Sequence, residues 1–269
     1  MKTAKPFVWR ETPGLPTLAT SVFLFQYLPL LVVIVFSFNV GKQVTIWDGF
    51  SVKWYASVFN NRDLGVALLN SLIVATASMI ASSVIALAAA LGLRSGTPQR
   101  GSNLTLGLIL LPLVVPEIVV AVATLVFFSG IGLKLGLINL IIAHTVFCVP
   151  FAFLPIQARL SDLGPAIEDA GRDLYSNEWA VFRRITMPLL MPAVLSGAML
   201  SFAASLDDFL ISMFLADAGQ TTLPVYIYGM LRVGVTPEVN AVSTLLLAFS
   251  VLIVLVALFL QRRESQRAA

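Results

Sequence analysis

Long stretches without a charged side chain recur along this 269-residue chain, and they restrict it to the class of membrane proteins. Charged residues make up 12% of the chain, about half their share in an ordinary soluble domain. A helix needs about 20 apolar residues to cross a bilayer. The uncharged runs therefore predict an all-α, polytopic fold, one membrane domain over residues 1–269. Its six spans are expected near residues 17–39, 65–93, 103–129, 136–157, 187–214 and 240–261.

The distribution of basic residues predicts how the chain crosses the bilayer. With the N-terminus in the cytoplasm, 12 of the 17 Lys and Arg residues fall in inner segments and five in outer ones. Inner segments of membrane proteins carry such an excess of basic residues. An even number of spans also places both termini on one side, so both are expected in the cytoplasm. The opening run follows Lys2, Lys5 and Arg10 but is too long for a signal peptide, and we expect it to be retained as the first span.

Composition also argues against several kinds of site. The formal net charge is only +3, which gives no reason to expect a nucleic-acid partner. Cys148 is the only cysteine and His144 the only histidine, so the sequence predicts no disulfide, no metal site and no cofactor. A single histidine in an apolar span is usually hydrogen-bonded to a neighbouring helix, with a catalytic role as the alternative.

One predicted cytoplasmic loop is unusually rich in charge. Residues 159–186 carry nine of the 31 Asp, Glu, Lys and Arg residues of the chain. Within the loop, helical spacing puts five residues on one face, namely Ile167, Ala170, Gly171, Leu174 and Tyr175, with Glu168, Asp169, Arg172 and Asp173 opposite. Such an amphipathic helix can lie on the membrane surface, or it can dock a cytoplasmic partner.

This loop resembles a known family. The run Glu168-Asp169-Ala170-Gly171-Arg172-Asp173-Leu174-Tyr175-Ser176 is similar to the EAA loop of binding-protein-dependent ABC importer permeases, with Asp169-Ala170-Gly171 in place of Glu-Ala-Ala and Tyr175-Ser176 where a turn glycine is usual. Four other stretches, 47–55, 143–148, 205–209 and 233–241, resemble the permeases of the spermidine/putrescine type.

The resemblance implies the type I ABC importer permease fold, with a coupling loop at 158–187 that docks on cytoplasmic ATPase subunits. It also implies a second permease subunit, a periplasmic substrate-binding protein and a place in the bacterial inner membrane. The chain would be a transport subunit and not an enzyme. The pattern G-x-x-x-x-G-K-[ST] is absent from the sequence, so ATP must be bound elsewhere. The alternatives are ABC import of another small solute, an ATPase-independent secondary transporter and, third, a membrane enzyme.

Three carboxylates fall within predicted spans, where charge is costly and usually faces a cavity or a partner. Glu117 follows Pro112 and Pro116, which predict a bend in the third span, and Asp207 and Asp208 are adjacent in the fifth. These acidic residues favour a cationic substrate such as a polyamine. The alternatives are that Glu117 lies near the outer interface and that one Asp caps a broken helix.

An aromatic segment, consisting of Trp47, Phe50, Trp54 and Tyr55, follows the first span on the outer side. It is expected to form an interfacial aromatic belt, or else a surface for the substrate-binding protein.

Overall fold

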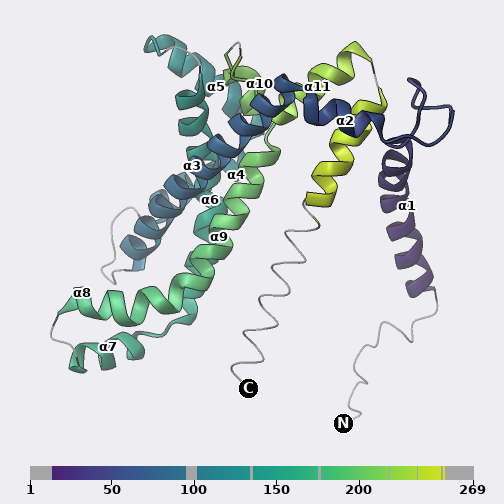
Figure 1. Ribbon diagram of the computed structural model, residues 1–269. Coiled ribbons are helices and arrows are strands. Elements are labelled where there is room, and N and C mark those ends of the chain that lie inside the picture. The colour runs from purple at the N-terminus through teal and green to yellow at the C-terminus, as the bar shows by residue number, and fades with distance from the viewer. Residues whose placement is uncertain are drawn as a thin grey trace. The chain divides into compact units, whose positions relative to one another are not determined.

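The computed structural model describes residues 14–94, 102–133, 136–174, 177–217, 219–234, 236–249 and 251. These residues form helices and connecting turns, with an isolated antiparallel bridge between Asn39 and Phe50 (Figure 1). The predicted all-α class is thus confirmed for the described chain. The chain divides into two compact units, one made of Met1–Arg62 with Gly229–Ala269 and the other of Asp63–Tyr228.

Four helical stretches within the described residues are long and apolar enough to cross a membrane. They are α1 (Leu15–Phe36), α3 (Arg62–Arg94), α6 (Leu137–Asp162) and the stretch Glu178–Asp207, which comprises α8 (Glu178–Val181), η2 (Phe182–Thr186) and α9 (Met187–Asp207). They overlap the first, second, fourth and fifth predicted spans. Near the sixth, a shorter apolar helix covers Pro237–Phe249, and residues 252–261 lie outside the described part. The number of six spans stays a prediction.

The third predicted span is two helices instead of one. Between α4 (Ser102–Val114) and α5 (Glu117–Gly130) the axis turns by 107°. The break falls at Pro116, which has no backbone N–H and adopts an extended conformation with ψ of 131°. The prolines predicted a bend here, and the bend is sharp enough to divide the segment.

The fifth predicted span is also interrupted. Helix α9 ends at Asp207, Asp208 is extended with ψ of 122°, and the short α10 (Leu210–Leu215) follows. Helix α11 (Leu223–Val233) lies after the next turn. Interrupted helices are tolerated at membrane depth where the freed backbone is buried in protein or lines a cavity.

The core of the second unit is an antiparallel pair, α6 and α9, that is linked at regular intervals. His144 bonds to Ser205 at 2.8 Å, and the Cys148 thiol and the Ser201 hydroxyl each donate to the other residue's carbonyl, at 3.3 and 3.2 Å. One further step along, a Cβ added to Gly197 would lie 2.6 Å from the carbonyl oxygen of Ala152. Glycine is therefore required for this helix approach, as at small-residue contacts between membrane helices generally.

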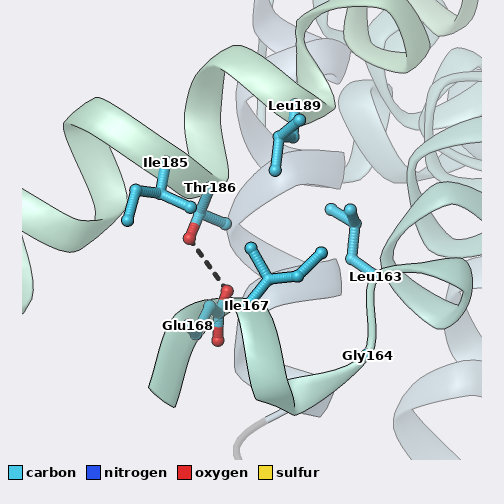
Figure 2. A pocket seen from close by; sticks show the side chains of 7 residues that line it. All are labelled: Leu163, Gly164, Ile167, Glu168, Ile185, Thr186 and Leu189. Carbon is cyan, nitrogen blue, oxygen red and sulfur yellow. Dashed lines mark hydrogen bonds between the residues drawn. The ribbon is translucent and has the colours of Figure 1, made fainter. Parts of the chain in front are cut away.

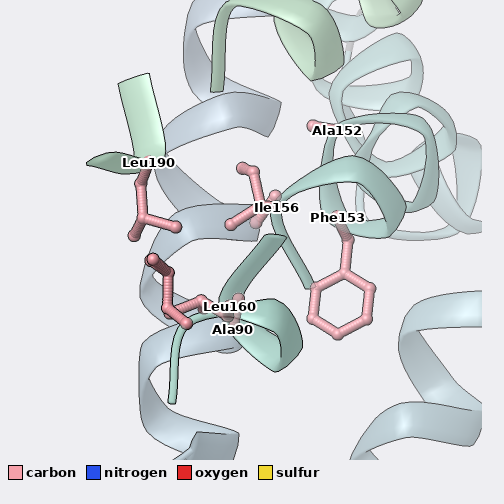
Figure 3. Packing of buried hydrophobic residues seen from close by; sticks show 8 residues of the cluster. Ala90, Ala152, Phe153, Ile156, Leu160 and Leu190 are labelled. Carbon is pink, nitrogen blue, oxygen red and sulfur yellow. The ribbon is translucent and has the colours of Figure 1, made fainter. Parts of the chain in front are cut away.

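Toward the predicted cytoplasmic end, apolar side chains fill the space between three helices. Ala90 of α3, Phe153 and Ile156 of α6 and Leu190 of α9 pack together and are buried (Figure 3). The buried positions of α3 recur at helical spacing, which places one face of this helix against the α6 and α9 pair.

In the first unit, α1 has exposed side chains along its length, and the turn after it is built around Asn39. The buried Asn39 amide donates to the carbonyls of Gln43 and Ile46, at 2.9 and 2.7 Å. Trp54 of α2 (Lys53–Asn60) donates to the Asn39 carbonyl at 2.8 Å. Trp47 and Phe50 are exposed, at 46% and 71%. The aromatic segment therefore divides into residues that build the turn and residues that face outward.

Candidate functional site

A buried polar cluster of the second unit lies where α9 is interrupted. His144 Nε2 is 3.4 Å from Asp208 Oδ1, and neither side chain is exposed. The other imidazole nitrogen of His144 bonds to Ser205, and Nε2 also lies 3.2 Å from the Ser212 hydroxyl. The histidine thus connects both sides of the break, as expected of a histidine bonded to a neighbouring helix.

Asp208 holds the start of α10. From the position before the N-cap residue Phe209, its Oδ1 accepts the Ser212 backbone N–H at 3.0 Å and so satisfies a donor of the first turn. Its other oxygen, Oδ2, is buried, and no described residue forms a hydrogen bond with it. Glu117, the first residue of α5, lies close enough to interact with Asp208. The structure therefore brings these two predicted residues together, Glu117 at the start of α5 and Asp208 just before α10.

Asp207 differs from its neighbour in being exposed, at the last residue of α9. Because Asp208 is extended and lies outside α9, the pair does not follow the helical period, and one aspartate turns inward while the other turns outward. The inward residue, Asp208, is the one that caps a helix. The outward residue and Glu117, which is partly buried, are the carboxylates with access to the surface.

The two helix breaks offer cation-binding chemistry. The last carbonyl groups of a helix lack intrahelical partners, and α4 and α9 both end beside a carboxylate. No Lys or Arg occurs in α4, α5, α9 or α10. Carboxylates and helix-terminal carbonyls together can receive the N–H donors of an ammonium group. Among the described residues, no group of three or more His, Cys, Asp and Glu could hold a metal ion.

The charged loop contains α7 (Pro165–Leu174), packed against the start of the α8 to α9 stretch. Gly171 is buried, and a Cβ there would meet the side chains of Ile185 and Val181. Ile167, on the same face, lines a recess beside Gly171 but is 46% exposed, and Leu174 is 78% exposed. The predicted apolar face therefore turns its glycine and part of Ile167 toward the protein and leaves Leu174 open.

The predicted polar face of α7 is divided in the same way. Asp169 and Asp173 are exposed, as is Ala170 of the apolar face. Arg172 bonds to Asp169 at 2.7 Å and to Glu178 at 2.8 Å, and these bonds and charges raise the pKa of the Arg172 guanidinium above its ordinary value. Tyr175 and Ser176, where the resemblance placed a turn glycine, lie outside the described residues.

Glu168 turns inward, although it was predicted on the polar face opposite Gly171. Its Oε1 accepts hydrogen bonds from Arg94 at 2.7 Å and from Thr186 at 2.8 Å. Glu168 and Thr186 border a shallow recess with five other residues, Leu163, Gly164, Ile167, Ile185 and Leu189 (Figure 2). The helical period cannot reveal this orientation, because the arginine that attracts Glu168 comes from α3, 74 residues earlier.

Several residues of the two sites were not identified from the sequence. Arg94, Thr186, Ser205 and Ser212 are ordinary polar residues within or beside apolar runs. A charged residue that ends a long apolar run, as Arg94 does, is the one signal that could have indicated a partner at the loop.

Comparison with known proteins places the chain in a family. Residues 83–269 match the family described as "Binding-protein-dependent transport system inner membrane component". The spermidine/putrescine transport system permease protein PotC of Escherichia coli K12 is 35% identical over 247 residues, covering 92% of this chain and 93% of that protein. The putrescine transport system permease protein PotI of the same strain is 35% identical over 252 residues, covering 91% and 90%.

Solved structures agree in fold. A bacterial ABC transporter involved in the import of the acidic polysaccharide alginate superposes with a TM-score of 0.68 at 15% identity, covering 96% of this chain and 99% of that one. The MetNI methionine ABC transporter superposes with a TM-score of 0.61 at 18% identity, covering 72% and 92%. With its interrupted apolar helices and charged loop, the chain belongs to the binding-protein-dependent inner membrane components, the permease subunits of ABC importers whose ATPase is a separate subunit.

Proposed function

We propose that this chain forms part of the pathway by which a polyamine, spermidine or putrescine, enters the cytoplasm. The observation that carries the proposal is the 35% identity, over about nine-tenths of both chains, to permeases named for these two substrates. The carboxylates Glu117, Asp207 and Asp208 at two helix breaks, with no basic residue in the same helices, support a cationic substrate.

The proposed mechanism is alternating access. A loaded periplasmic binding protein delivers the substrate to this chain and a second permease subunit, a homologue or a second copy. ATP-driven closure of the cytoplasmic ATPase subunits moves α7 and, through it, the membrane helices. The carboxylates replace part of the hydration shell of the ammonium groups, which makes a cation's passage less costly. This subunit carries out no covalent chemistry.

Uptake by the complete transporter tests the substrate. Proteoliposomes that contain this chain with its ATPase, second permease and binding protein are expected to accumulate labelled spermidine or putrescine in an ATP-dependent manner. Unlabelled polyamines should compete, whereas a neutral amino acid should not. ATP-dependent uptake of a different solute, with no competition by polyamines, would agree with an importer but contradict a polyamine as its substrate.

The exposed surface of α7 is proposed as the docking surface for the ATPase subunit. Its exposed apolar side chains, Ile167 and Leu174, are those that an interface would bury.

Replacing Ile167 and Leu174 by arginine is expected to weaken ATPase binding by about 30-fold, equivalent to the ~2 kcal/mol of an interface hot spot. Co-purification with the ATPase measures the effect. The control Ser161→Arg adds a charge at an exposed position of α6 and should leave co-purification unchanged. Normal co-purification of the double variant would contradict this docking surface.

The proposed topology has both termini, and α7, in the cytoplasm, because 12 of 17 basic residues then lie inside. Reporter fusions after Arg172 are expected to be active only for a cytoplasmic reporter, and fusions after Lys53 only for a periplasmic one. The opposite pattern at either position would overturn the orientation.

A further inference from the structure

The Glu168 carboxylate connects segments that are far apart in the sequence. Its Oε1 accepts hydrogen bonds from Arg94 Nη1 and from the Thr186 hydroxyl. Arg94 is the last residue of α3, and Thr186 is the last residue of η2, directly before α9. The second guanidinium nitrogen of Arg94 donates to the carbonyl of Leu163, directly after α6, at 2.8 Å. We name this set of residues, Arg94, Leu163, Glu168 and Thr186, the loop clamp.

Burial separates the loop clamp from the ion pairs on the outer side of α7. The side chains of Arg94 and Glu168 are 23% and 20% exposed, whereas Arg172 is 47% exposed and Asp169 65%. Exposed ion pairs contribute little to stability because solvent screens them. Charge-assisted bonds shielded from solvent are stronger, and losing one partner leaves the other charge without compensation.

The geometry of the clamp suits the transfer of movement. Gly171 packs against Val181 and Ile185, so its contacts join α7 to the next two short helices. The clamp joins α7 to α3, to the end of α6 and to the start of α9 by directional bonds. The five-residue π-helix that ends at Thr186 continues directly into α9. π-Helical turns often occur at functional positions in helices.

We infer that Glu168 is a positioning residue for transport coupling, through which the displacement of α7 is passed to α3 and α9. The inference rests on the proposed docking of α7 to an ATPase subunit, and it goes further by naming the link between docking and the membrane helices. Glu168 is turned toward Arg94 and Thr186, so in this inference it contacts the permease and not the ATPase subunit.

Charge reversal in the complete transporter tests the loop clamp. Proteoliposomes with ATPase, second permease and binding protein are prepared with Glu168→Arg, with Arg94→Glu and with both. Each single variant is expected to co-purify with the ATPase and to keep basal ATP hydrolysis. The stimulation of hydrolysis by loaded binding protein should fall about tenfold, corresponding to ~1.4 kcal/mol of lost coupling.

The double reversal restores an ion pair between α3 and α7, and a hydroxyl can accept as well as donate. The stimulation of ATP hydrolysis is therefore expected to recover to within about threefold of the parent, because the effects of substitutions at two residues in contact are not additive. Recovery is partial because the Leu163 carbonyl loses its donor. The matched control Asp162→Arg reverses an exposed charge at the end of α6 and should leave stimulation unchanged.

Provided that binding protein stimulates ATP hydrolysis by the parent transporter, either of two results would overturn the inference. The single reversals could show the same stimulation as the parent, or the double reversal could show no more stimulation than the weaker single variant. Should the reversals fail to assemble, Glu168→Gln and Thr186→Val weaken the clamp without a misplaced charge. Both are expected to lower stimulation about threefold, and unchanged stimulation would reject the clamp. A parent transporter whose ATP hydrolysis does not respond to binding protein would reject the proposed function instead.

Discussion

Replacing Gly197 by valine is expected to abolish accumulation of the folded permease. Even a Cβ at this position would lie 2.6 Å from the Ala152 carbonyl oxygen and 3.0 Å from its Cα, and both are backbone atoms that no rotamer change can move away. Separating α6 from α9 would also lengthen the bonds between Cys148 and Ser201 in the next turn. Overpacking of this kind costs ~3 kcal/mol or more, a large part of the ~5 to 15 kcal/mol that holds a protein folded.

Gly107→Val is the matched control for this substitution. Gly107 lies in α4, and a Cβ there has nothing within 4 Å. The amount of monodisperse protein in detergent and its unfolding temperature compare the two variants. Gly107→Val should behave as the parent, and Gly197→Ala should fall between the parent and Gly197→Val. An unfolding temperature of Gly197→Val equal to that of the parent would show that the two helices are not held at this distance.

Neutralising Glu117 and Asp207 together is expected to remove polyamine uptake while the transporter still assembles. These are the two carboxylates with access to the surface beside the helix breaks. A hydrogen bond to a charged group contributes ~1.5 to 3 kcal/mol, so losing two should slow transport by about 100-fold or more. Initial rates of labelled spermidine uptake measure the effect in Glu117→Gln with Asp207→Asn. Full uptake by the double variant would reject their role in the pathway.

Three further variants separate the possible causes of a loss of uptake. Asp63→Asn removes an exposed negative charge in the first turn of α3 and should leave uptake unchanged. Asp208→Asn keeps an oxygen for the Ser212 N–H, so α10 should stay capped. Asp208→Ala loses that cap and should lower stability by ~1 kcal/mol or more. Comparing the last two variants separates the structural role of Asp208 from any contribution of its charge.

The apolar runs were sufficient to predict the membrane class and the places of most helices, because hydrophobic length alone decides what can enter a bilayer. Pro112 and Pro116 predicted the bend in the third segment, since each proline removes a backbone donor. The break at Asp208 had a weaker signal, because an aspartate can either face a pathway or cap a helix. Only the position of the Ser212 backbone N–H distinguishes these two roles.

The inward orientation of Glu168 lay beyond what the sequence could predict. Helical periodicity sorts residues by polarity and assigns charged ones to the solvent side. That assignment fails where a partner from a distant segment compensates the charge, as Arg94 does. His144, by contrast, behaves as a single histidine in an apolar span is expected to, because its bonds to Ser205 and Ser212 satisfy both ring nitrogens.

The regular linkage of α6 and α9 has a mechanical consequence. Contacts that recur at every turn, from His144 with Ser205 to Ala152 with Gly197, prevent the helices from sliding past each other. The pair must therefore respond to a force on the loop as one lever. Helix α9 has 21 residues, so its length is about 30 Å. A rotation of about 10° at the loop end would carry Asp207 through about 5 Å, on the order of the rise of one helical turn.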